Sequence, residues 1–82
     1  MIKRTLTRET RMKLANPKNE AVKSELVLSL GITRSAVNGL LRVNAVNGRL
    51  TTETALTVLE KGLKMSRQDI LEVEITEDEN EN

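Results

Sequence analysis

The chain has no cysteine, histidine, tryptophan, tyrosine or phenylalanine, and only one proline among its 82 residues. Without cysteine it can form neither disulfides nor thiolate metal ligands, and without histidine it lacks the commonest metal ligand and general base. No glycine-rich phosphate loop is present either, so we expect no metal, no cofactor and no enzymatic activity. The missing aromatic rings also disfavour binding of single-stranded nucleic acid or RNA by base stacking.

The small size and the missing aromatic residues limit the hydrophobic core. A chain of 82 residues is one domain near the lower end of what folds alone, and its core must consist of Leu, Val, Ile, Ala and Met. A dimer interface would supplement such a core. No apolar run approaches the ~18 residues of a membrane span, and no apolar region follows the basic N-terminus as it would in a secretory signal. We therefore expect a cytoplasmic protein without a membrane partner.

Charge is unevenly distributed, although the net charge is only +1. Residues 1–49 carry ten Lys or Arg and three Glu, whereas residues 50–82 carry three basic and nine acidic residues. The basic half indicates a surface that faces phosphate groups. We expect residues 1–75 to form the folded domain and residues 76–82 a disordered acidic tail. The alternative is a tail that competes with nucleic acid for the basic face.

Residues 23–42 predict two short helices joined by a tight turn. Apolar residues follow helical spacing in both halves. Gly31 stands where the first helix must end in a left-handed conformation, and Ile32 can fill the corner after it. Thr33 is placed to cap the second helix, which we expect over residues 34–42. The apolar positions are Leu26, Val27 and Leu30 in the first half, and Val37, Leu40 and Leu41 in the second.

This pattern resembles a helix-turn-helix, the unit whose second helix enters the major groove of DNA. Its five motif positions are filled by Val27, Gly31, Ile32, Val37 and Leu40. Together with the later stretch L-K-M-S-R-Q-D-I-L, it is similar to the lambda-repressor-like domain of phage repressors, Cro proteins and many small bacterial regulators. The resemblance covers roughly Thr5 to Leu71 and implies an all-α bundle of about four to five helices. An ordinary helical hairpin in an unrelated bundle is the alternative.

The resemblance places the exposed face of the second helix against DNA. Arg can bond guanine bidentately, and Asn can do the same to adenine. Gly39 is unusual there, and indicates close approach of DNA, packing against another helix, or simple tolerance. The expected base contacts are Arg34, Ser35, Asn38, Gly39 and Arg42. The expected phosphate contacts are Lys23, Thr33, Asn44, Asn47 and Arg49.

The segments before the two helices predict one further helix. We interpret residues 1–5 as a short basic arm. A helix capped by Thr5 or Thr7 then runs to about Ala15. Asn19 can cap the first helix of the helix-turn-helix pair.

The segments after them predict a loop and two more helices. Asn47-Gly48 indicates either a small hairpin wing or an irregular loop, and we favour the loop because the flanks are short. Thr51 or Thr52 can cap a helix that follows. Ser66 can cap a last short helix, with Asp69 as a relative of the capping box.

Residues 71–76 alternate between apolar and polar side chains, which is the period of a β-strand. They form either a short C-terminal strand or a fraying extension of the last helix. Cro-type proteins resemble the first alternative when they dimerise through a C-terminal strand. The expected dimerisation residues are Leu71, Val73 and Ile75.

These observations predict a sequence-specific regulator of transcription that binds double-stranded DNA. It would be a repressor that acts as a homodimer on an operator through the recognition helix 34–42. One alternative is an antitoxin-type regulator whose acidic C-terminal segment grips a basic toxin. Another is a protein-interaction module that binds a partner through its apolar C-terminal stretch.

Overall fold

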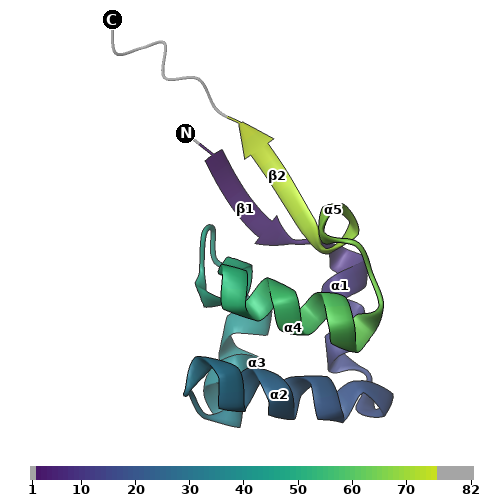
Figure 1. Cartoon of the computed structure of the whole chain (residues 1–82). Helices are drawn as coiled ribbons and strands as arrows, with labels where there is room; N and C mark the ends of the chain where they lie inside the picture. The colour runs from purple at the N-terminus through teal and green to yellow at the C-terminus, as the bar shows by residue number, and fades with distance from the viewer. Residues whose placement is uncertain (1, 76–82) are drawn as a thin grey trace, which may run out of the picture.

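The computed structural model describes residues 2–75, so the predicted acidic tail at 76–82 lies outside the described residues. Along the chain, a first strand is followed by five α-helices and a second strand, and the two strands pair with each other (Figure 1). Two 3₁₀ turns, Pro17–Asn19 and Arg49–Thr51, connect helices. The helices are α1 Arg8–Ala15, α2 Glu20–Leu30, α3 Arg34–Val43, α4 Glu53–Leu63 and α5 Arg67–Ile70, and the strands are β1 Ile2–Leu6 and β2 Leu71–Ile75.

The five helices agree with the expected small helical bundle, to which the two strands add a short antiparallel sheet. Leu6 lies opposite Leu71, and Ile2 lies opposite Ile75. The strand predicted at the C-terminal end is confirmed, and its alternative, an extended last helix, is wrong. The basic arm expected at residues 1–5 is also wrong, because β1 occupies that segment. The ribbon of β1 and β2 extends away from the helices (Figure 1).

The first helices begin and end largely where their capping residues predict. The Thr7 side chain caps α1 by accepting from the Thr10 N–H. Gly31 ends α2 with a left-handed φ of 65°, and the Thr33 hydroxyl accepts from the Ala36 N–H at 3.1 Å to cap α3. Asn19 precedes α2 as expected, but its side chain donates to the Lys13 carbonyl instead of capping the helix.

The second half of the chain follows the same logic with two exceptions. Thr52 caps α4 by accepting from the Ala55 N–H at 3.4 Å. Ser66 precedes α5, yet its hydroxyl bonds the Asp69 carboxylate at 3.0 Å and not a main-chain N–H. Residues 44–48 form an irregular loop without a hairpin, so the wing is wrong and the favoured loop is confirmed.

The core takes at least one fully buried aliphatic side chain from each helix. These side chains are Leu14 from α1, Leu26 from α2, Val37 from α3, Leu59 from α4 and Ile70 from α5. Helices α2 and α4 approach closely at Gly62, where an added Cβ would lie 2.8 Å from a Val22 methyl carbon. This close approach holds α2, and with it the start of α3, against the rest of the core.

Arg67 holds α5 to α4 on the outside of this core. Its guanidinium lies 2.6 Å from the Glu53 carboxylate and 3.2 Å from that of Glu60. Hydrogen bonding to Glu53 raises the pKa of Arg67, and a hydrogen bond to Glu60 adds to the increase, although desolvation opposes it.

Candidate nucleic-acid interface

The turn between α2 and α3 sets the two helices at a steep angle. The segment Pro17–Leu30 and α3 meet at 104°, within the range of about 90–120° found in helix-turn-helix units. Both Gly31 and Ile32 donate their main-chain N–H to the Val27 carbonyl, which fixes the turn. Within residues 2–75 no single helix is long and apolar enough to cross a membrane, and only this bent pair passes that test by length and composition.

Helix α3 has one buried side and one exposed side. Val37 is completely buried, and Leu40 and Leu41 are half-buried against the core. This side fixes the rotation of α3 about its axis, so the other side projects from the molecule in a defined orientation. The predicted base-contacting residues Arg34, Ser35, Asn38 and Arg42 are all exposed, and Gly39 is half-buried.

Arg34, Asn38 and Arg42 follow one another at intervals of four residues and so lie along one stripe of α3. Eight residues of helix cover about 12 Å, the length of roughly three to four base pairs. A stripe of two guanidinium groups and one amide can therefore reach several adjacent base edges in a major groove.

Arg34 is already engaged within the protein. Its guanidinium forms an ion pair with Glu20 and a hydrogen bond with the Ser24 hydroxyl, both at the start of α2. The side chains of Arg34 and Glu20 are 43% and 53% exposed, so water screens the pair. An exposed pair of this kind is worth about 0–1 kcal/mol, which is less than the ~1–3 kcal/mol of a good bidentate base contact. The pair is thus compatible with a base-contacting role for Arg34.

Gly39 lies in open space on α3. Apart from its chain neighbours and the backbone of α3, a Cβ added to it would meet no atom within 4 Å. The interpretation that Gly39 packs against another helix is therefore wrong. Close approach of DNA and simple tolerance remain as explanations.

The expected phosphate contacts are placed very differently from one another. Lys23 is only 9% exposed, so most of its side chain packs among the core helices and little of it is within reach of a phosphate. Thr33 and Arg49 are exposed, as the assignment requires. Arg49 lines a shallow hollow of about 410 Å³ together with Gly39 and Arg42 of α3, so two arginines and the open glycine border the same part of the surface.

Asn44 and Asn47 bind the first strand through their side chains. Asn44 accepts from the Leu6 N–H at 3.0 Å and donates to the Leu6 carbonyl at 3.3 Å. Asn47 accepts from the Arg4 N–H at 2.9 Å and donates to the Ile2 carbonyl at 3.1 Å. Both asparagines have left-handed φ angles, of 50° and 54°. Sequence reasoning missed this structural role, although Asn is the residue after Gly that most readily adopts such angles.

The predicted dimerisation residues do not share one environment. Leu71 is 8% exposed and packs within the core of its own chain, whereas Val73 and Ile75 are 52% and 73% exposed. Only the latter two are available to a partner along β2.

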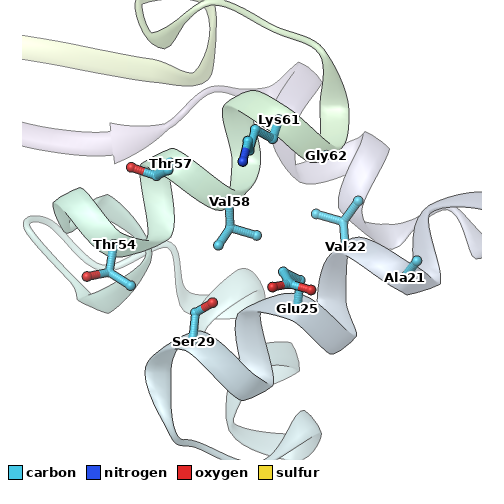
Figure 2. A pocket seen from close by; sticks show the side chains of 9 residues that line it. All are labelled: Ala21, Val22, Glu25, Ser29, Thr54, Thr57, Val58, Lys61 and Gly62. Atoms are coloured by element: carbon cyan, nitrogen blue, oxygen red, sulfur yellow. The ribbon is translucent and has the colours of Figure 1, made fainter.

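A second hollow lies away from α3, between α2 and α4. This groove of about 710 Å³ has Glu25 on one wall and Lys61 on the other, with Val22 and Val58 between them (Figure 2). None of the predicted DNA contacts lines it. Among residues 2–75, no group of three acidic side chains is arranged to hold a metal ion.

Comparison of the chain with protein-family models, with curated proteins and with solved structures found no match in any of the three. A functional interpretation of the α3 face therefore depends on its geometry and chemistry.

Proposed function

We propose that the chain is a sequence-specific regulator of transcription, a repressor, that binds double-stranded DNA through α3. In this proposal α2, the turn and α3 form a helix-turn-helix of the lambda-repressor-like class. The observation that carries it is the stripe of Arg34, Asn38 and Arg42 on the exposed side of α3, held at 104° to the preceding helical segment. Val37 anchors the opposite side of α3, so the stripe has a fixed orientation.

The proposal assigns different roles to the residues around the stripe. Arg34, Ser35, Asn38 and Arg42 contact bases, and Gly39 lets the DNA approach α3 without a side chain between them. Phosphate is contacted by Thr33, which is exposed at the start of α3, and by Arg49, which is exposed beside α3. The protein acts as a symmetric homodimer whose two α3 helices enter successive major grooves about 34–36 Å apart.

The decisive experiment compares affinity for a selected and a scrambled duplex. A duplex would be selected from a random library, and binding to both duplexes would be measured by gel shift at two salt concentrations. We expect selective binding that weakens with salt, because phosphate contacts release counterions. Equal binding to both duplexes, or none, would contradict the proposal.

A variant of the stripe then tests the assignment of α3. Asn38→Ala should lose about 1–3 kcal/mol of binding to the selected duplex and relax specificity at one base position. Gln68→Ala is the matched control, since Gln68 is also an exposed amide on a helix but lies on α5. A loss that is uniform across sequences would reassign Asn38 to the phosphate backbone.

A further inference from the structure

The two-stranded sheet has one edge that the protein itself covers. The outer edge of β1 faces the loop 44–48, where the Arg4 and Leu6 N–H groups donate to the side chains of Asn47 and Asn44. The Asn47 N–H in turn donates to the Arg4 carbonyl at 2.8 Å. These bonds occupy the positions that a third strand would need, so β1 cannot accept one.

The outer edge of β2 is open. The main-chain groups of Arg4 and Leu6 point at the loop. Main-chain groups of successive residues in a strand point to opposite edges, so those of Lys3 and Thr5 point at β2, where these residues lie opposite Glu74 and Glu72. The main-chain groups of Val73 then point away from β1. Within residues 2–75 no hydrogen bond satisfies these outward groups. An uncovered strand edge of this kind is a template for pairing with another strand.

The side chains of β2 give this open edge two chemically distinct faces. Glu72 and Glu74 lie on one face, are exposed and form no ion pair with any described residue. Val73 and Ile75 lie on the other face and are at least half exposed. On one face the ribbon presents Glu72 and Glu74, which form no ion pair within residues 2–75 although Lys3 lies opposite Glu74 on β1. On the other face β2 presents the apolar side chains of Val73 and Ile75, with Arg4 of β1 opposite Val73.

A second copy of the chain fits this edge poorly. Antiparallel pairing of two β2 strands about Val73 places Glu72 of each copy directly opposite Glu74 of the other. Centring the pair on either glutamate places that residue opposite itself. Like charges directly opposite one another destabilise a sheet. In these three registers charge disfavours the homodimer expected through Leu71, Val73 and Ile75, and the burial of Leu71 disfavours it further.

We infer that the open edge of β2 binds an extended segment of a different protein that carries Lys or Arg at alternate positions. Two basic side chains of that segment lie opposite Glu72 and Glu74, and an apolar residue between them covers Val73. The main-chain N–H and carbonyl of Val73 pair with the added strand, as in other cases of β-augmentation. This site uses neither α3 nor DNA and so goes beyond the proposed function.

The test uses a short synthetic peptide of alternating Lys and Val residues, with a peptide of alternating Glu and Val as its control. Fluorescence anisotropy of the labelled peptides, titrated with the full chain, measures affinity, and sedimentation gives the stoichiometry. We expect one Lys/Val peptide to bind per chain and the Glu/Val peptide not to bind. No binding of the Lys/Val peptide at millimolar concentration overturns the inference.

Two variants distinguish the β2 edge from general attraction to the acidic C-terminal residues. Val73→Pro removes the outward N–H without removing a bond to β1, and should weaken the Lys/Val peptide about tenfold. Val73→Ala is its matched control and keeps the N–H. Glu72→Lys combined with Glu74→Lys leaves the main chain intact and should reverse the preference, so that the Glu/Val peptide binds at least about tenfold tighter than the Lys/Val peptide.

Two further results would also overturn the inference. Unchanged binding by Val73→Pro would locate the peptide elsewhere, on the acidic residues beyond β2. A homodimer in sedimentation that Val73→Pro dissociates would assign the edge to a second copy. Binding of duplex DNA by α3 is measured separately, by the gel shift.

Discussion

Replacing Gly39 by Ala should stabilise the protein, because the structure leaves room for the added methyl group. Apart from its chain neighbours and the backbone of α3 itself, no atom lies within 4 Å of the position that a Cβ would occupy, and the residue is inside α3 with helical geometry. Ala is favoured over Gly inside a helix by about 1 kcal/mol. For a domain of this size that corresponds to a rise in melting temperature of roughly 4–8 °C, which circular dichroism resolves easily.

The second helical glycine provides the matched control. At Gly62 the same methyl group would lie 2.8 and 3.0 Å from the two Cγ atoms of Val22. A β-branched side chain in a helix has little rotational freedom to move away, so Gly62→Ala forces α2 and α4 apart. Overpacking of this kind costs about 1–3 kcal/mol, which exceeds the gain in helix propensity of about 1 kcal/mol. We expect Gly62→Ala to lower the melting temperature and Gly39→Ala to raise it.

Duplex binding by the Gly39→Ala variant then decides what Gly39 does. If DNA approaches α3 closely, Gly39→Ala will be more stable and yet bind the selected duplex at least about tenfold more weakly, a loss of about 1.4 kcal/mol. If it binds as tightly as the original chain, Gly39 is merely tolerated and the proposed close approach is wrong. A melting temperature that does not rise would refute the reasoning about free space at α3 itself.

Three further variants test other parts of the structure. Glu20→Gln releases Arg34 and should tighten binding of the selected duplex by at most about fivefold. Glu25→Gln, also on α2, is its control, and an equal effect of both would indicate only a change in net charge. Asn44→Ala leaves the Leu6 N–H without its partner and places Ala at a left-handed φ. The free energy of unfolding in urea should therefore fall by about 2–4 kcal/mol, and a fall below ~1 kcal/mol would contradict the structural role of Asn44. Gly31→Ala should lower the free energy of unfolding by about 1–2 kcal/mol in the same assay, because a φ of 65° disfavours a Cβ even where the surrounding space is free. An unchanged urea midpoint would contradict this reasoning.

The helices could be predicted from the sequence because their signals are local. Gly31, Thr33 and Thr52 each act within one helical turn, through a backbone angle or a single side-chain hydrogen bond. The apolar periodicity around Val37 likewise assigned the buried side of α3 correctly. Where a cap failed, at Asn19 and Ser66, the side chain had found a competing partner, which helix propensity does not describe.

The burial of Lys23 escaped prediction for a related reason. Helical position alone placed it on the first turns of α2, where phosphate contacts are common, but the packing of α2 against the neighbouring helices decides which of its sides faces outward. Only the assembled core turns Lys23 inward to 9% exposure. A lysine can follow the apolar side of a helix because its long aliphatic stem packs as a hydrophobic group does.

The first strand illustrates the limit of local reasoning most clearly. In β1 the face that bears Ile2 and Leu6 also bears Arg4, so the alternation that marks a strand is interrupted. What makes residues 2–6 a strand is pairing with β2 on one edge and with the side chains of Asn44 and Asn47 on the other, some forty residues away along the chain. Asn44 directly follows α3 and Asn47 lies three residues further along the chain, so the two asparagines join α3 to the sheet. They also close the edge of β1, and it is this closure that leaves β2, with Glu72 and Glu74, as the open edge of the ribbon.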